Sequence, residues 1–365
     1  MKVAVITNCN VLDRTNLGVF KKIYGQIKAF LSYGFDANFF YKKSYILVKE
    51  DINIRKVSYM RPNCTEEMYN YILKNIKDIK YDLIYIRYPM SDYFFLSFLR
   101  NIKLINNNIK VILDFPTYPY DKEIINDKRM LNIDIYFRKL LNEFVDMGIC
   151  YNNVNYIYDI PVCNIGNGID VKNINKKNNI RKITDKEINL IAVANISFWH
   201  GYDRLIKGLA EYYKKEHIYK IKFNIIGDGN EIRTLMDIVE NENSNTYVKF
   251  LGVKKGKELD EIFNSCDIGV GSLGMYRKGL IDGSELKNRE YCSRGLPFIF
   301  AYDDKDFQQN FKYCMKVNND NSNIDINSII EFYEDLKTDN NVIDNMRRYA
   351  EENLTWEKKM MSILE

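Results

Sequence analysis

The chain has 365 residues, which is long enough for two domains that each bury a core of their own. Hydrophobic residues make up 46% of the sequence and charged residues 28%, a balance that excludes an intrinsically disordered chain. The net charge of +4 is too small to indicate a nucleic-acid-binding protein, and two histidines are too few for a histidine-based zinc site.

The first half of the chain alternates short apolar runs with helical patterns. It opens with MKVAVITNCN, which enters a strand pattern directly, so we expect no secretory signal segment. The patterns predict strands over 3–6, 37–40, 83–86, 111–115 and 161–165, and helices from 16, from 65, over 93–104 and over 130–147. This alternation is typical of βαβ units around a parallel sheet.

The alternation restarts after a polar, basic stretch over 172–188, which we expect to be a linker region. The patterns predict strands over 190–193, 223–226, 248–251, 268–270 and 297–301, and helices from 202, from 231 and over 258–265. The last segment, NLTWEKKMMSILE, has a helical pattern and is expected to pack back on the first domain.

The predicted fold class is therefore α/β, with two Rossmann-like, doubly wound domains facing a central cleft. The first domain covers residues 1–168 and is completed by a C-terminal helix over about 350–365, and the second covers 169–349. The seven cysteines are scattered and form no C-x-x-C pair, which indicates free thiols. The longest apolar stretch, near 93–99, is too short to span a bilayer, so we expect a cytoplasmic protein.

The segment DGSELKNREYCSRGLPFIF, residues 282–300, predicts a polar loop, a short helix and a buried strand. Ser284 is the expected N-cap, which places Lys287 in the first helical turn. The helix macrodipole disfavours a cation there by about 0.3–1 kcal/mol, so a bound anion would explain the lysine. The alternative is that Glu285 and Glu290 simply neutralise Lys287 on a solvated face.

Three further strand-to-helix turns have residues suited to a ligand. Gly18 begins the first helix, where a glycine lets the backbone approach an anion. His200, in ANISFWHGYDRLI, could reach a phosphate or sugar, or could be a capping or packing histidine. Gly227 and Gly229 bracket Asp228, and such a turn either offers N–H groups to phosphate or needs its glycines for conformation alone.

The second half resembles the donor domain of the GT-B glycosyltransferases, specifically the large retaining family 4. The resemblance covers most of the chain and rests on six segments in order: NGID at 167–170, the HGYDRLI turn, IIGDGNE, VKFLG at 248–252, SCDIGVGS, and the REYCSRGLPFI block. A subgroup with an S-x-L-K-x-R-E-Y block is most similar. The resemblance implies transfer of a sugar from a nucleotide diphosphate sugar, with UDP the expected nucleotide.

The resemblance also implies roles for single residues. Glu290 would accept the ribose hydroxyls, because a carboxylate can bind a vicinal diol with two charge-assisted hydrogen bonds. Asp282, eight positions earlier, would approach the donor sugar, with Glu285 as the other candidate.

The family's diphosphate-binding Arg and Lys are replaced here by Asn195 and His200. Lys287, supported by Ser284, is therefore the expected cation for the diphosphate, with Arg277 or Lys278 in reserve. Gly18, His200 and Gly227 complete the expected donor-binding set.

The acceptor half departs from the family by having no histidine after its fourth predicted strand. The chain reads DFPTYPYDKE there, so Asp114, Thr117 and Tyr118 are the candidate acceptor-binding residues. Tyr118 and Tyr120 could stack on a sugar or be packed aromatics. The expected acceptors are a glycan, a lipid-linked glycan or a protein, in surface glycan assembly. Basic residues of this half would suit a peripheral membrane contact: Lys21, Lys22, Lys28, Lys42 and Lys43.

The implied chemistry is retaining, needs no metal or other cofactor, and relies on electrostatic stabilisation of the leaving diphosphate. Two alternatives remain. One is a GT-B sugar-nucleotide epimerase, against which the scarcity of histidine counts. The other is a non-enzymatic nucleotide-sugar-binding partner of another transferase, which the replacements at Asn195, His200 and Asp282 keep open.

Overall fold

The computed structural model describes residues 1–13, 16–178, 186–307 and 311–364. The chain divides into two compact units. Unit 1 comprises Met1–Gly168 and Trp356–Glu365, and unit 2 comprises Ile169–Thr355. Part of the expected linker, residues 179–185, lies outside the described residues.

Unit 1 is built on a mostly parallel sheet. Its strands are β1 (Lys2–Asn10), β2 (Asp36–Lys43), β3 (Ile46–Asp51), β4 (Lys56–Met60), β5 (Leu83–Arg87), β6 (Lys110–Asp114), β7 (Met147–Cys150), β8 (Tyr156–Ile157) and β9 (Ile160–Asn164). In the described part of the chain their order is β4-β3-β2-β1-β5-β6-β7-β9-β8. Strands β3, β4 and β8 are antiparallel to their neighbours, and the other pairings are parallel.

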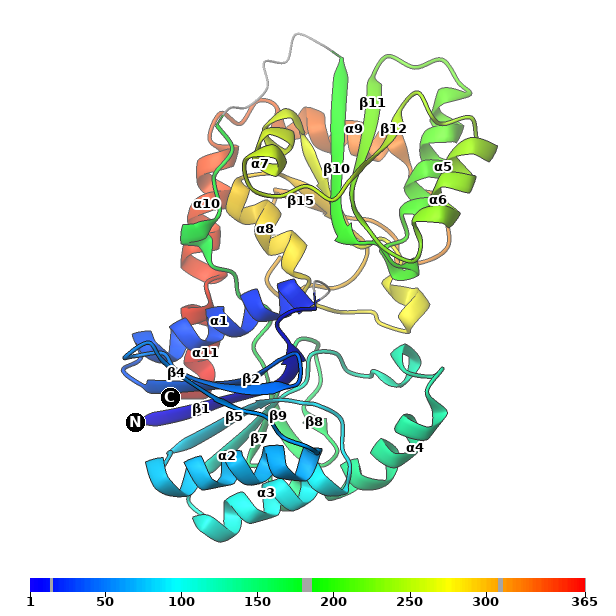
Figure 1. Ribbon diagram of the computed structural model, residues 1–365. Helices are drawn as coiled ribbons and strands as arrows, with labels where there is room; N and C mark the ends of the chain where they lie inside the picture. The colour runs from blue at the N-terminus through cyan, green and yellow to red at the C-terminus, as the bar shows by residue number, and fades with distance from the viewer. Residues whose placement is uncertain (14–15, 179–185, 308–310, 365) are drawn as a thin grey trace. The chain divides into compact units, whose positions relative to one another are not determined.

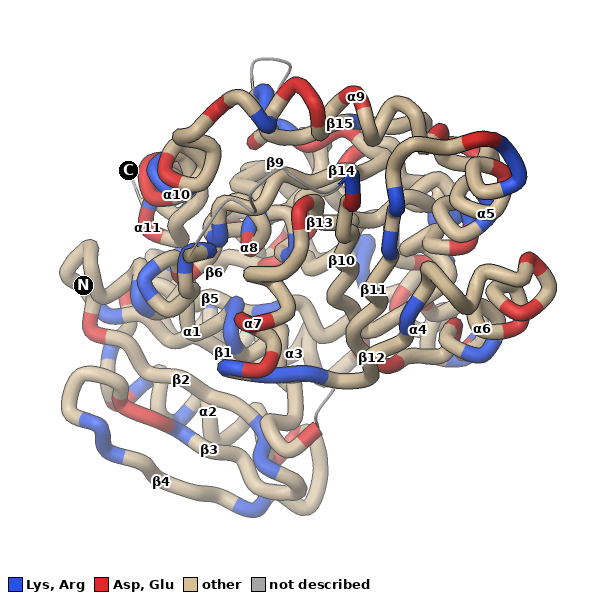
Figure 2. Tube along the Cα trace, turned by 90° about the horizontal axis from the view of Figure 1, so that it is seen from above, with Lys and Arg blue, Asp and Glu red and all other residues tan. Residues whose placement is uncertain are grey.

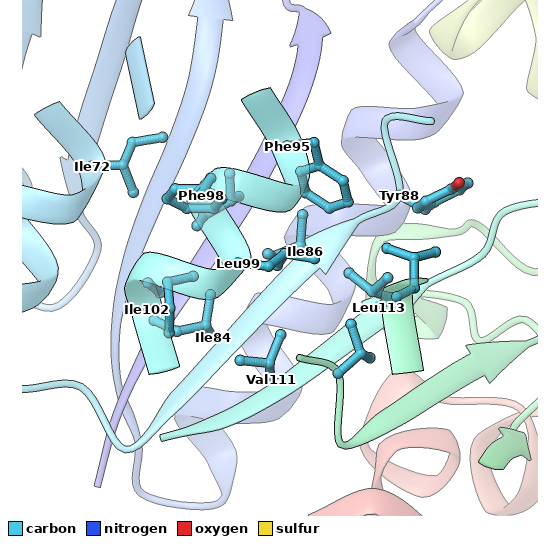
Figure 3. Close-up of a cluster of buried hydrophobic side chains, with 14 of the residues drawn as sticks. Ile72, Ile84, Ile86, Tyr88, Phe95, Phe98, Leu99, Ile102, Val111 and Leu113 are labelled. Atoms are coloured by element: carbon cyan, nitrogen blue, oxygen red, sulfur yellow. The ribbon is translucent and has the colours of Figure 1, made fainter. Parts of the chain in front are cut away.

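Helices cover both faces of this sheet (Figure 1). They are α1 (Leu17–Ser32), α2 (Thr65–Ile79), α3 (Tyr93–Ile105), α4 (Lys128–Phe137) and α11 (Trp356–Leu364), with short 3-10 turns η2 (Asp121–Glu123) and η3 (Arg138–Glu143). Because side chains alternate along a strand, one set faces α2 and α3 and the other faces α1. Figure 3 shows the first set, in which Ile84 and Ile86 of β5 pack against Phe98 and Leu99 of α3.

The C-terminal helix α11 belongs to unit 1, as the sequence predicts. It packs on α1, and its first residue, Trp356, is buried between Gly25 and Gly168. A Cβ atom at either glycine would overlap the indole ring, so both positions need glycine to admit the tryptophan.

Unit 2 holds a parallel sheet. Its strands are β10 (Glu187–Asn195), β11 (Lys220–Asp228), β12 (Val248–Gly252), β13 (Ile268–Val270), β14 (Phe298–Phe300) and β15 (Cys314–Lys316), and among the described residues their order is β12-β11-β10-β13-β14-β15. Its helices are α5 (Tyr202–Tyr213), α6 (Ile232–Asn241), α7 (Gly256–Ser265), α8 (Leu286–Arg294), α9 (Ile326–Leu336) and α10 (Val342–Asn353), with 3-10 turns η4 (Val171–Asn173), η5 (Phe198–His200) and η6 (Met275–Lys278).

The two faces of the unit 2 sheet carry separate cores. Leu190 of β10 packs with residues of α5, α6 and α9, whereas its neighbour Ile191 packs with residues of α7, α8 and α10. The sheet order reverses at β10, since β11 lies on one side of it and β13 on the other. In doubly wound sheets, ligands bind at such a reversal, beyond the carboxyl ends of the strands.

Three expectations differ from the structure. The helix expected over 130–147 ends at Phe137 and continues as η3, because Arg138 is drawn to Asp121 and Asp134. The antiparallel strands β3 and β4 were not predicted, since the apolar run of β3 is only Ile46–Val48 before three charged residues, and β4 has a mixed sequence. Residues 187 and 188, assigned to the linker, already belong to β10.

Basic and acidic positions are spread over both units and interleave along the trace (Figure 2). Each of the seven cysteines is a free thiol. Of the helices in the described ranges, none combines the length and apolarity needed to cross a bilayer.

Candidate functional site

The amino end of α8 lies where two loops of unit 2 meet. The loop after β13 bonds to the loop after β10, because Leu273 N donates to His200 O at 2.8 Å and Gly274 N to Trp199 O at 3.2 Å. Gly201, at φ 62°, allows this contact, since a Cβ there would press on the backbone of Gly274. The residues that follow two neighbouring strands are thus brought together beside α8.

Glu285 is the N-cap residue of α8, one position later than the predicted Ser284. The shift has a physical cause, because the Glu285 carboxylate turns away from the helix and accepts hydrogen bonds from Ser272. The Ser272 hydroxyl donates at 2.6 Å and its backbone N–H at 3.2 Å. Ser284 is buried beside it in the loop. The carboxylate therefore fastens the helix end to the loop after β13.

Lys287 lies in the first turn of α8, as predicted, with a side chain only 12% exposed. Its ammonium donates long hydrogen bonds of 3.4 Å to the Tyr202 and Ser272 hydroxyls, and its nearest carboxylate, Glu285, is 4.0 Å away. Burial lowers the pKa of Lys287, and Glu285 acts in the opposite direction. The alternative is therefore wrong about the solvated face, because Lys287 is mostly buried, whereas Glu285 does lie at ion-pair distance, 4.0 Å away.

His200 is buried and holds the turn before α5. Its Nδ1 accepts a hydrogen bond from Ser197 N at 2.9 Å, and its ring stacks on Tyr202 with centroids 5.4 Å apart. Burial lowers the pKa of His200 well below its ordinary value, and the charge of Lys287 lowers it further. The imidazole is therefore neutral at neutral pH and leaves the positive charge of this region to Lys287.

Glu290 follows one turn after Lys287 but pairs with a different residue. Its Oε1 accepts from Arg294 Nε at 2.9 Å, and Arg294 also binds Asp260 at 2.7 Å. The Glu290 side chain is 32% exposed, and among the described residues its Oε2 has no hydrogen-bond partner. Oε1 of Glu290 is thus held by Arg294, and Oε2 can accept a hydrogen bond from a hydroxyl group.

Arg289 anchors α8 from its buried side. The guanidinium is fully buried, binds Asp304 in a two-pronged pair, with one contact at 2.7 Å, and also binds Asp306. Both carboxylates follow β14, so the pair ties α8 to the next strand-end loop. This ion pair sets the position from which Lys287 and Glu290 project.

The two glycines of the IIGDGNE turn are explained by conformation. Gly227 has φ 128°, and a Cβ there would overlap the carbonyl oxygen of Ala194. A Cβ at Gly229 would overlap the backbone of Ile196 in the same way. The loops after β10 and β11 touch through backbone at these points, which favours the structural alternative for Gly227 over phosphate binding.

The remaining candidates of unit 2 lie around α8. Asp282 is half-buried, and its backbone forms a β-bridge with Asp303. Arg277 is committed to Asp203 through two bonds of 2.8 Å, so its charge is already compensated. Lys278 stands over the Trp199 ring at 4.7 Å. Compared with Arg277, Lys287 is less closely compensated, because its carboxylate neighbour Glu285 lies 4.0 Å away.

In unit 1, Asp114 ends β6 and is fully buried. Its carboxylate accepts from Tyr151 Oη at 2.6 Å and Gln26 Nε2 at 3.2 Å, and Lys22 Nζ lies 3.8 Å away. In this conformation Asp114 is closed to an acceptor, contrary to the sequence-based expectation of direct contact. Burial lowers the pKa of Lys22 to about 7, and Asp114 opposes the shift.

The other unit 1 candidates lie at the same edge of the sheet. Thr117 and Tyr118 are partly exposed, and Tyr118 contacts Tyr158 edge-on at 5.8 Å. Tyr120 is buried and donates to Asp134 at 2.5 Å, so it is a packed aromatic. Gly18 is exposed in the first turn of α1, and no described atom lies within 4 Å of its Cβ position.

A polar cavity of about 370 Å³ has Arg294 in its lining. Lys176, Lys177, Asp260 and Glu261 are among its lining residues, whereas Lys287 and Glu290 are not. Within the described ranges, no group of three or more His, Cys, Asp or Glu side chains is placed to hold a metal ion.

Several residues of this region were not predicted from the sequence. Ser272, Tyr202, Arg294 and Asp260 all contact candidate residues, but their roles depend on contacts between distant segments. The burial of Lys22, in contrast, could have been predicted from the sequence. It shares the inward face of α1 with Gln26 and Phe30, four and eight positions on, which is the spacing of a buried helical stripe.

Comparison with known proteins gives a family-model match to part of the chain and a fold for the whole of it. Residues 173–299, which include the candidate residues of unit 2 from His200 to Glu290, match the family model Glycosyl transferases group 1. No curated protein matches the chain.

Solved structures match along its whole length. A glycosyltransferase from Rickettsia africae is 12% identical, with TM-score 0.64 and coverage of 100% of this chain and 97% of that one. HepE from Anabaena, in complex with UDP, is 13% identical, with TM-score 0.63 and coverage of 100% and 98%. The lipopolysaccharide outer core galactosyltransferase WaaB, without ligand, is 13% identical, with TM-score 0.60 and coverage of 100% and 99%. At these identities the likeness shows the fold, and the predicted GT-B class is confirmed.

Proposed function

We propose that this chain transfers a sugar from a nucleotide diphosphate sugar, with UDP as the nucleotide, to an acceptor hydroxyl. The observation that carries the proposal is Lys287, a mostly buried ammonium in the first turn of α8 whose nearest carboxylate is 4.0 Å away and bound to Ser272. A diphosphate at this helix N-terminus would bring a negative charge closer to the ammonium than Glu285 does. The residue also lies inside the segment that matches the group 1 glycosyl transferases, and HepE, of the same fold, was solved with UDP.

The other residues of α8 fit the same donor. The open Oε2 of Glu290 is suited to the ribose diol, while Arg294 holds the other oxygen in place. Asp282 and Glu285 remain the two candidates for the sugar hydroxyls. Glu285 is already engaged by Ser272, so a sugar contact there would share an oxygen with that bond.

We propose that transfer retains the anomeric configuration and needs no metal. The bond from the anomeric carbon to the diphosphate oxygen breaks, and a bond from that carbon to the acceptor oxygen forms. The departing phosphate takes the acceptor's proton, so no separate base is needed. Lys287 would stabilise the negative charge that develops on the leaving group, and its effect would be strengthened by partial burial.

The proposed acceptor is a sugar or lipid-linked glycan in the cytoplasmic stage of surface glycan assembly, with a protein acceptor as the other class. In unit 1, Thr117 and Tyr118 are the partly exposed candidates for acceptor contact. Asp114, which is buried and bound to Gln26 and Lys22, would contribute to the structure of this edge of the sheet and not to direct acceptor contact.

The test is to incubate the protein with a panel of nucleotide sugars and acceptors and to measure nucleotide diphosphate release. Proton NMR of the product, begun at early times, gives the anomeric configuration, and a chelator should leave the rate unchanged. Nucleotide binding without release on any acceptor would favour the non-enzymatic partner. Conversion of the donor to an epimeric sugar would favour the epimerase.

A further inference from the structure

A buried polar network lies at the carboxyl ends of β5 and β6 in unit 1. Arg87 ends β5 and is the ladder partner of Asp114, the last residue of β6. Ile84 and Ile86 of β5 face α3 (Figure 3), so the alternate residues Tyr85 and Arg87 face α1. Arg87 therefore lies on the same side of the sheet as the Asp114 carboxylate.

Neutral donors occupy both oxygens of the Asp114 carboxylate. Its Oδ1 accepts from Tyr151 Oη at 2.6 Å, and its Oδ2 accepts from Gln26 Nε2 at 3.2 Å. Gln26 also donates to Tyr85 Oη at 2.8 Å, which ties the network to β5. Among the residues that the structure describes, the one ion-pair contact of Asp114 is Lys22 Nζ, at 3.8 Å. The carboxylate is thus held by neutral groups and compensates only one cation, at a long distance.

The ammonium of Lys22 makes no hydrogen bond to a described residue. Its side chain is 7% exposed, and its Nζ lies 3.3 Å from the centroid of the Tyr151 ring. The sequence-based expectation counted Lys22 among the residues of a membrane contact, but a side chain buried to this degree is not available to a membrane surface. Lys22 is instead a buried cation whose hydrogen-bond donors have no acceptor in the described part of the chain.

The guanidinium of Arg87 brings a second cation to the same place. Its Nη1 is buried without a hydrogen-bond partner, and Arg87 forms no ion pair within the described ranges. Burial is the main cause of the lowered pKa of Lys22, and the nearby charge of Arg87 lowers it further. A buried N–H group without an acceptor is unfavourable, so a partner from outside the chain would stabilise it. Arg87 as a whole is partly exposed, which allows a ligand to reach its side chain.

We propose that Arg87 and Lys22 bind a phosphate or carboxylate group carried by the acceptor. When Lys22 is protonated, the network holds two cations and one carboxylate, so one positive charge is uncompensated. The planar fork of Arg87 can hold two oxygens of such a group, and Lys22 can meet it as a point charge. An anion beside Lys22 would also favour its charged form and oppose the effect of burial on its pKa. The assignment to the acceptor rests on the proposed function, in which Thr117 and Tyr118 at the same sheet edge contact the acceptor.

The test is calorimetric titration of the full chain, with UDP present to occupy the donor site, using glucose, glucose 6-phosphate, glucuronate and inorganic phosphate as probes. The two anionic sugars should bind at least about tenfold more tightly than glucose. Arg87→Met and Lys22→Met should each raise the Kd for the anionic sugars at least about tenfold and leave that for glucose unchanged. Arg87→Lys should lose less, because it keeps the charge and removes only the fork. The matched controls are Arg100→Met and Lys21→Met, which change exposed residues of α3 and α1.

Circular dichroism melting checks that every variant folds, and UDP affinity is measured separately. Equal affinity for glucose and the anionic sugars, no binding of any anionic probe, or binding that neither variant weakens would overturn the proposal. A weaker UDP affinity in Arg87→Met would assign the anion to the donor diphosphate and overturn the assignment to the acceptor. Binding of anionic sugars that depends on Arg87, without nucleotide diphosphate release on any acceptor, would refute the proposed function and leave the anion site standing.

Discussion

Replacing Lys287 with methionine tests whether the charge of Lys287 serves ligand binding or the stability of the fold. Methionine keeps most of the side chain's apolar volume and removes the ammonium. In the folded protein that ammonium makes only hydrogen bonds of 3.4 Å, to Tyr202 and Ser272, and burial opposes its charge. We therefore expect Lys287→Met to leave the free energy of unfolding within about 1 kcal/mol of wild type, or to raise it.

The effect on ligand binding should be much larger. A charged hydrogen bond from Lys287 to a diphosphate oxygen contributes about 1.5–3 kcal/mol, so the Kd for UDP should rise by roughly 10- to 150-fold. Isothermal titration calorimetry measures this, with Lys257→Met as the control because Lys257 is 92% exposed. Unchanged UDP affinity together with a stability loss above about 2 kcal/mol would refute the reasoning and make Lys287 a structural residue.

Three further variants test other parts of the two units. Glu290→Gln should weaken UDP binding by about 1–3 kcal/mol, and a 2′,3′-dideoxy analogue of UDP should not distinguish the variant from wild type. Arg289→Met should destabilise unit 2 by about 3–5 kcal/mol in urea unfolding, because Asp304 would stay buried without its partner; adding Asp304→Asn should restore part of the loss. Wild-type unit 1 should gain stability as the pH rises from about 7 toward 10.5, since the folded-state pKa of Lys22 is about 7 and the unfolded-state value is higher. Lys22→Met should remove this rise, which has a ceiling of about 5 kcal/mol, and an unchanged pH dependence in the variant would contradict the assignment.

The parts of the fold that the sequence predicts are those with strong local patterns. Strands such as β5 and β13 are short apolar runs, and helices such as α3 have an apolar stripe, so their burial follows from periodicity. The edge strand β4 and its neighbour β3 have too short an apolar run to be predicted in this way. The change from α4 to the 3-10 turn η3 at Phe137 was also not predicted, and the contact of Arg138 with Asp121, 17 residues away, is invisible to local periodicity.

The position of helix α8 in the candidate site could be predicted from the sequence, whereas most of the contacts of its side chains could not. The position of Lys287 in the first turn of α8 follows from the glycine and proline after the helix and the polar loop before it. Its weak pairing could not be predicted, because this depends on Ser272, thirteen residues before Glu285, drawing that carboxylate away. Pairing of Glu290 with Arg294 was accessible from the i, i+4 spacing alone.

The buried Trp356 has a consequence for the order in which the protein is completed during synthesis. Unit 1 needs the indole ring between Gly25 and Gly168, yet the whole of unit 2 is translated before that residue. A ribosome-bound fragment ending at residue 168 would have an open gap in unit 1, whereas unit 2 has its own residues in one continuous segment. Unit 2 can therefore finish folding first. The core of unit 1, although most of it is translated earlier, is completed only when α11 packs on it.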